Sequence, residues 1–146
     1  MILYLDSSAL VKLYVTEPGS DTVRRLVDTA DVSATSAIAY AEVRAALARR
    51  HREGDISTRD LGRIKPALLS DWEALFVVPV TGAVALTAGG LSEQYAIRGM
   101  DSVHLASALW LGRRQTDRVT FAAWDERLAA AAEQAGLTVA GAGRRP

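Results

Sequence analysis

The stretch Ile2-Leu3-Tyr4-Leu5-Asp6-Ser7-Ser8 runs four apolar residues directly into a carboxylate. A short, continuous apolar run bounded by polar residues predicts a strand that is buried on both faces, as the strands of a parallel sheet are. Asp6 then lies at the carboxyl end of the strand, where open α/β sheets bind their ligands. Carboxylates that follow other strands or begin helices could therefore converge on Asp6.

Beyond this strand, short apolar runs alternate with helical segments along the whole chain. Pro66 lies inside one of these segments and predicts either a kinked helix or two separate pieces. The alternation favours an α/β fold with a mainly parallel central sheet of four to five strands, covered by helices on both faces. Further strands are predicted at 32–35, 75–80, 119–122 and 137–139, and helices at 7–14, 20–30, 36–52, 57–74, 83–98, 101–114 and 125–135.

The chain has 146 residues, a formal net charge of zero and no cysteine. The length predicts a single domain over residues 1–140, followed by a flexible tail over 141–146. The absence of cysteine excludes disulfides, thiolate nucleophiles and cysteine-ligated metal centres, and is consistent with a reducing cytosol. No apolar run approaches the length that crosses a bilayer, so we expect a cytoplasmic protein without a signal peptide or membrane span.

Four carboxylates occupy positions that suggest one shared site, namely Asp6, Glu42, Asp101 and Asp125. Helix capping would explain Asp6, Asp101 and Asp125 taken one at a time. It does not explain Glu42, which is predicted about two turns into its helix, among apolar residues. A buried carboxylate is costly unless it is paired or coordinates a metal ion, so an ion pair with an arginine is the alternative for Glu42.

Carboxylates packed together repel each other and cannot all ionise cheaply. A hard divalent cation resolves that conflict, and a site rich in oxygen ligands with few histidines favours Mg²⁺ or Mn²⁺ over zinc. Such ions neutralise charge on a phosphoryl group and activate water. His104 lies three residues after Asp101, on the same helix face. We interpret it as a core histidine or a partner of the metal ligands rather than a catalytic base.

The segment YLDSSALVKLY at 4–14 resembles the opening motif of PIN-domain ribonucleases and, among them, of the VapC toxins of bacterial toxin–antitoxin systems. The segments AEVRAAL at 41–47, DSVHLASAL at 101–109 and FAAWDERL at 121–128 are similar to their second, third and fourth acidic motifs. The resemblance covers about residues 1–140 and implies a PIN-like three-layer α/β/α sandwich. It also implies that Asp6, Glu42, Asp101 and Asp125 are the catalytic residues that bind Mg²⁺ or Mn²⁺.

Two further positions bear on this resemblance. Ser8 matches the hydroxyl residue that often follows the first aspartate by two positions and supports it. Ala123 departs from the family pattern, because a serine or threonine commonly stands two residues before the fourth acid. A hydroxyl that would fix that carboxylate is therefore missing, which leaves Asp125 either a direct ligand or one that acts through water.

The resemblance implies a metal-dependent endoribonuclease toxin that cleaves RNA phosphodiester bonds, forms a homodimer and is neutralised by a VapB-like antitoxin. Arginines suit contacts to RNA phosphates. Two alternatives stay open: a PIN-like nuclease outside toxin systems, and a non-catalytic PIN-like module that binds a protein partner. The arginine clusters that are candidates for RNA contacts are Arg24-Arg25, Arg49-Arg50-Arg52 and Arg113-Arg114.

Overall fold

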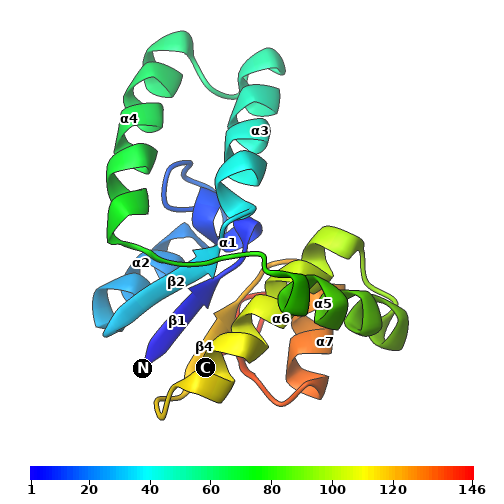
Figure 1. Cartoon of the computed structure of the whole chain (residues 1–146). Helices are drawn as coiled ribbons and strands as arrows, with labels where there is room; N and C mark the ends of the chain where they lie inside the picture. The colour runs from blue at the N-terminus through cyan, green and yellow to red at the C-terminus, as the bar shows by residue number, and fades with distance from the viewer.

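The computed structural model describes residues 1–146 and is built on one five-stranded sheet in the order β3-β2-β1-β4-β5. Every pair of neighbouring strands is parallel, and β1 lies at the centre, with Ile2 opposite both Val32 and Val119. The predicted α/β fold with a parallel sheet is therefore confirmed (Figure 1). The strands are β1 (Ile2–Leu5), β2 (Val32–Ser36), β3 (Phe76–Val78), β4 (Val119–Ala122) and β5 (Thr138–Ala140).

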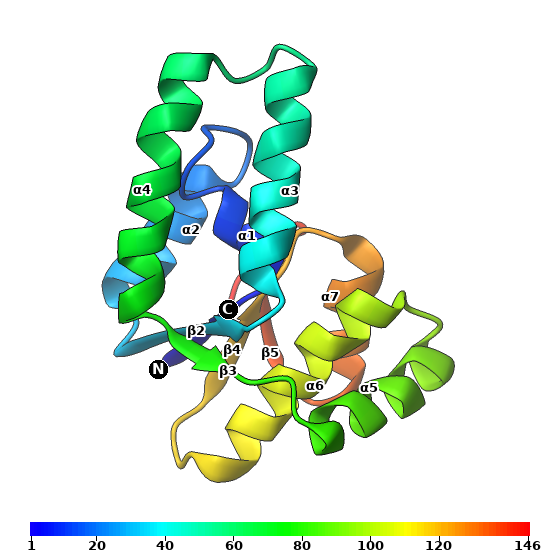
Figure 2. The same ribbon diagram turned by 45° about the horizontal axis from the view of Figure 1, so that its top comes forward.

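Seven helices cover the two faces of this sheet. Side chains alternate between the faces along a strand, so Ile2 and Tyr4 enter the core beneath α6 and α7, whereas Leu3 and Leu5 enter the core beneath α1 to α4. The two helical layers with the sheet between them are seen in Figure 2. The helices are α1 (Ser7–Val11), α2 (Ser20–Thr29), α3 (Ala39–Arg52), α4 (Thr58–Ala74), α5 (Gly82–Tyr95), α6 (Gly99–Arg114) and α7 (Glu126–Gln134).

Helices α3 and α4 extend side by side beyond the edge of the sheet (Figures 1 and 2). Of the two outcomes predicted from Pro66, a kinked helix or two pieces, the second is wrong because α4 is a single helix, and the kink stays a prediction. Pro66 removes the donor that would bond the carbonyl of Gly62. Both residues are exposed, so water can satisfy that carbonyl.

Two predicted helix boundaries shift in ways that matter for the acidic residues. Strand β2 continues through Ser36, so α3 begins only at Ala39. Helix α5 stops at Tyr95 because Ala96 takes a left-handed conformation with φ 51°. Helix α6 then begins at Gly99, so that Asp101 lies within its first turn.

The last residues make defined contacts. Gly141 and Arg144 form a short bridge, and Arg144 pairs with Glu126 and Glu133 on either end of α7. The flexibility expected of residues 141–146 stays a prediction. None of the seven helices is both long and apolar enough to cross a membrane.

Candidate active site

Asp6 lies where β1 ends and α1 begins. Its carboxylate caps α1 by accepting a hydrogen bond from the backbone N–H of Ala9 at 2.8 Å, and it accepts a second from Ser8 Oγ at 2.7 Å. Only 4% of Asp6 is exposed. Burial raises the pKa of Asp6 to about 6, against the opposing influence of His104 and of these two hydrogen bonds. Capping and site membership are thus compatible roles for one carboxylate.

Glu42 occupies the first turn of α3, so the prediction that placed it about two turns into the helix is wrong. The reason is that Ser36 belongs to β2 and residues 37–38 form a turn, so α3 begins three residues later than expected. Glu42 Oε1 accepts hydrogen bonds from Ser7 Oγ at 2.6 Å and from His104 Nε2 at 2.7 Å. The partners of Glu42 are therefore a histidine and a serine. The alternative of an ion pair with an arginine is wrong. Burial would raise the pKa of Glu42, but these two partners outweigh it and leave the pKa below its ordinary value.

His104 connects the core of the protein to the acidic residues. It is 1% exposed, and its Nδ1 is hydrogen-bonded to the hydroxyl of Tyr4 at 3.0 Å. Its Nε2 donates to Glu42, because a carboxylate can only accept. A buried residue of β1 thereby fixes the imidazole, and the imidazole fixes the carboxylate of α3.

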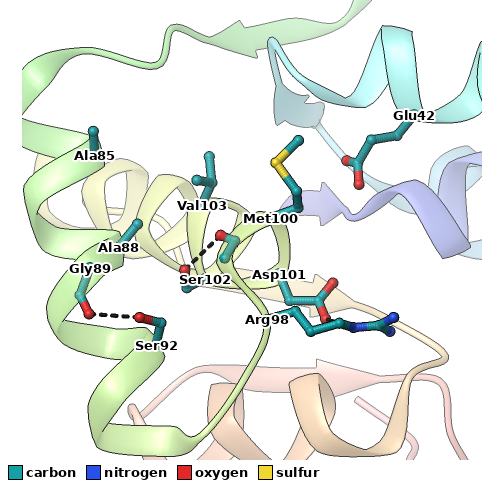
Figure 3. Close-up of a pocket in the computed structure, with 11 residues that line it drawn as sticks. Glu42, Ala85, Ala88, Gly89, Ser92, Arg98, Met100, Asp101, Ser102 and Val103 are labelled. Atoms are coloured by element: carbon teal, nitrogen blue, oxygen red, sulfur yellow. Dashed lines mark hydrogen bonds and ion pairs between the residues drawn. The ribbon is translucent and has the colours of Figure 1, made fainter.

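Asp101 and Asp125 face each other across Arg98. Arg98 Nε lies 3.4 Å from Asp101 Oδ2, and a terminal nitrogen of the same guanidinium lies 3.6 Å from Asp125 Oδ2. Burial raises the pKa of Asp101 and the Asp125 carboxylate adds to this, while Arg98 opposes both without cancelling them. Asp125 also caps α7 by accepting from the N–H of Leu128 at 2.9 Å. Figure 3 shows Glu42 and Asp101 directed toward the same open space, with Arg98 alongside Asp101.

Ser8 links the end of β1 to the segment that precedes Asp125. Its Oγ donates to Asp6 and accepts from the backbone N–H of Trp124 at 3.0 Å. Ala123 itself is fully buried. The end of β1 and the segment that precedes Asp125 are therefore joined through Ser8, and Asp125 is positioned by its capping bond.

All four predicted carboxylates line one pocket of about 400 Å³ at the carboxyl edge of the sheet. No three acidic or histidine side chains lie together in an arrangement that could hold a metal ion as they stand. Glu42 is engaged by His104 and Asp101 by Arg98, so both would have to turn to share a cation. The chemistry of the donors nevertheless fits Mg²⁺ or Mn²⁺, because all four are carboxylates and these ions prefer oxygen ligands.

Several residues of this pocket were not singled out from the sequence. Ser7 is the neighbour of Asp6, and its contact with Glu42 depends on the packing of α1 against α3. Lys12 gave a usable signal, because it is one of only two lysines in the chain and follows an apolar segment. Among the predicted arginine clusters, Arg49 and Arg50 reach this pocket. The other cationic and acidic lining residues are Lys12, Glu17 and Arg98.

A second, wider hollow of about 710 Å³ adjoins the acidic pocket, with Glu42, Arg98 and Asp101 lining both. Its far wall is formed by small side chains of α5, including Ala85 and Ala88 (Figure 3). Glu42 and Asp101 therefore line both hollows, whereas Asp6 and Asp125 line only the smaller one.

Comparison with known proteins agrees with this geometry. The model of the PIN domain family matches residues 3–134. Ribonuclease VapC45 of Mycobacterium tuberculosis (strain CDC 1551 / Oshkosh) is 41% identical over 139 residues, which span 95% of this chain and 94% of the relative.

Solved structures share the fold. The Sarcin-Ricin loop cleaving toxin VapC20 of Mycobacterium tuberculosis superposes with a TM-score of 0.65 at 19% identity, covering 99% of both chains. Another match is a chain in the structure of VapBC2 from Rickettsia felis, which was solved bound to a DNA fragment from the VapBC2 promoter. It gives a TM-score of 0.65 at 15% identity over 97% of this chain and 98% of the other. The family model and the identity to a VapC ribonuclease together show that the chain belongs to the PIN-domain family, among the VapC ribonucleases.

Proposed function

We propose that this chain is an Mg²⁺- or Mn²⁺-dependent endoribonuclease toxin that hydrolyses RNA phosphodiester bonds in the acidic pocket. The observation that carries the proposal is the convergence of four carboxylates from separate elements on one pocket at the carboxyl edge of a parallel sheet. The 41% identity to a VapC ribonuclease supports the reaction class. The residues are Asp6, Glu42, Asp101 and Asp125.

Each carboxylate has a defined part in this reaction. Asp6, Glu42 and Asp101 hold the divalent ion, and Asp125 contributes either directly or through water. When bound, the ion neutralises charge on the phosphoryl group and activates water. Ser8 and the N–H of Ala9 keep Asp6 oriented.

Orientation by the surrounding protein extends to Glu42. His104 and Ser7 hold its carboxylate at the edge of the pocket from two directions. Both bonds use Oε1, so Oε2 is left for a cation once the side chain turns toward the other acids. His104 acts by positioning Glu42, since its imidazole is buried and bonded at both nitrogens.

A VapB-like antitoxin is proposed as the partner that neutralises the toxin, and a homodimer as the working form. Support comes from identity to a VapC ribonuclease and from the shared fold with a chain of VapBC2. The same identity favours the toxin over a PIN-like nuclease outside toxin systems. The presence of all four acids in one pocket disfavours a non-catalytic binding module.

Cleavage of RNA by the purified chain tests the proposal. Cleavage should require added Mg²⁺ or Mn²⁺, should stop in EDTA, and should be lost in Asp6→Asn and Asp101→Asn. Asp28→Asn is the matched control, because Asp28 is an exposed carboxylate of α2 that does not line the pocket. Full activity of folded Asp6→Asn or Asp101→Asn would contradict the assignment.

A further inference from the structure

The acidic pocket has a basic side, formed by Lys12, Glu17 and Arg50. Lys12 Nζ donates to Glu17 Oε1 at 2.7 Å, and Arg50 pairs with the other oxygen of the same carboxylate. Lys12 is 7% exposed overall, which is unusual for a lysine. The three side chains come from the end of α1, from the loop that follows it and from the last turn of α3.

This cluster keeps a net positive charge. One carboxylate faces two cations, and although burial would raise the pKa of Glu17, Lys12 and Arg50 outweigh it and hold the pKa below its ordinary value. Glu17 is therefore ionised at neutral pH and neutralises only one of its two partners. Arg49 also lines the pocket and forms no ion pair, which adds to the positive side.

The cluster of Lys12, Glu17 and Arg50 has more N–H donors than carboxylate acceptors. An ammonium and a guanidinium carry more N–H groups than one carboxylate can accept. Lys12 and Arg50 each make a single hydrogen bond, and both go to Glu17. Lys12 and Arg50 both line the pocket that holds the four acids, where a bound anion could accept the remaining N–H groups.

The surroundings hold the cluster in place without a ligand. The N–H of Glu17 donates to Ser20 Oγ at 3.0 Å, and Ser20 Oγ in turn donates to the carbonyl of Val15 at 3.0 Å. Lys12 Nζ lies 5.2 Å from the centroid of the Trp124 ring, a distance at which a cation is attracted to the ring face. Gly19, in the same loop, packs so closely on Trp124 that a side chain there would clash.

We propose that Lys12 and Arg50, held by Glu17, bind a phosphate of the RNA backbone that neighbours the phosphate being cleaved. This rests on the proposed function, since it takes RNA as the substrate. Lys12 follows Asp6 by six positions, which is about 9 Å along a helix at 1.5 Å per residue. The cations thus flank the carboxylates rather than occupy their position, and they fix the register of the strand while the acids act on the adjacent linkage.

The competing explanation is a purely structural ion pair between the loop at Glu17 and helix α3. Two single substitutions separate the explanations, because Arg50→Gln and Glu17→Gln break the same ion pair but change the charge of the cluster in opposite directions. A structural tie predicts the same direction of effect on RNA binding for both. A phosphate site predicts weaker binding for Arg50→Gln and stronger binding for Glu17→Gln.

The experiment measures binding of a short fluorescein-labelled single-stranded RNA of mixed sequence, in EDTA so that cleavage does not occur. Arg50→Gln should bind about tenfold more weakly, and the slope of log K against log salt should fall by about 0.7, the value for one phosphate contact on a single strand. Glu17→Gln should bind about threefold more tightly than the wild type, because it removes the negative charge that neutralises one of the two cations. Lys12→Gln repeats the test at the other cation.

Arg59→Gln is the matched control, because Arg59 is an exposed arginine of the neighbouring helix α4 and does not line the pocket. It should change affinity far less than Arg50→Gln. In cleavage assays with metal, Arg50→Gln should raise KM with little change in kcat, as expected for lost substrate binding. Equal weakening by Arg50→Gln and Glu17→Gln, or unchanged affinity in Arg50→Gln, would overturn the phosphate site. A wild type that neither binds nor cleaves RNA would instead overturn the proposed function itself.

Discussion

Asp6 shows how one residue can oppose folding and serve a site. Its pKa in the folded chain, about 6, lies above the ordinary value of 3.8 because the carboxylate is buried. The folded, metal-free chain therefore binds this proton more tightly than the unfolded chain does. The contribution of Asp6 to the free energy of unfolding is fully present below pH 3.8 and is lost as the pH rises through about 6. The loss amounts to about 3 kcal/mol once the carboxylate is fully ionised in the folded chain.

Replacing Asp6 by asparagine should stabilise the metal-free protein at neutral pH while abolishing cleavage. The amide removes the buried charge and keeps an oxygen that can accept from Ser8 and Ala9. Urea unfolding at pH 4 and pH 8 measures the difference. The stabilisation should be small at pH 4 and approach about 3 kcal/mol at pH 8. A variant that is destabilised equally at both pH values would refute this description of Asp6.

His104 differs from Asp6, because hydrogen bonds at both ring nitrogens offset the cost of burying its imidazole. Substitution by alanine would open a cavity and leave Tyr4 and Glu42 without their partner. The free energy of unfolding should fall by about 2–4 kcal/mol. Ser102→Ala on the same helix serves as a comparison, since its hydroxyl bonds only to the local carbonyl of Gly99. A loss below about 1 kcal/mol in His104→Ala would show that the imidazole is not a structural link.

At the scale of elements, the sequence predicted boundaries best where an apolar run is followed closely by a helix-capping residue. The strand at 119–122 was predicted to the residue, since it is an apolar run that ends before a capping aspartate. The boundary between α5 and α6 was misplaced, because Ala96 rather than a glycine takes the left-handed conformation that ends α5.

The partners of the acids could not be read from the sequence, because they come from distant elements. His104 is 62 positions from Glu42 in the chain. The convergence of the four acids was predictable, since strand ends and helix starts meet at one edge of a parallel sheet.

Ala96 offers a test of the helix boundary that it sets. Glycine avoids the steric cost of the left-handed conformation, so Ala96→Gly should raise the free energy of unfolding by about 0.5–1 kcal/mol. Ala45→Gly, at an exposed position inside α3, should lower it by about the same amount. Thermal unfolding of the two variants should therefore shift in opposite directions. A downward shift in both would contradict the assigned backbone at Ala96.

For the whole molecule, the main feature is an uneven distribution of charge in a chain whose net charge is zero. The acidic pocket takes carboxylates from both helical layers, since Glu42 belongs to α3 and Asp101 to α6. Its basic side takes Lys12 and Arg50 from one layer only. A divalent ion bound among the acids would tie the two layers together across the sheet and should stabilise the domain as a whole.

Calorimetric titration of Mn²⁺ into the wild type and into four single variants tests the central claim most directly. The variants are Asp6→Asn, Glu42→Gln, Asp101→Asn and Asp125→Asn, with Asp28→Asn as control. We predict binding by the wild type and the control, loss of binding for the first three variants, and weakened binding for Asp125→Asn. Binding should also weaken below pH 6, because Asp6 must lose its proton to bind the ion. Undiminished Mn²⁺ binding by folded Asp6→Asn and Asp101→Asn would contradict a shared metal site.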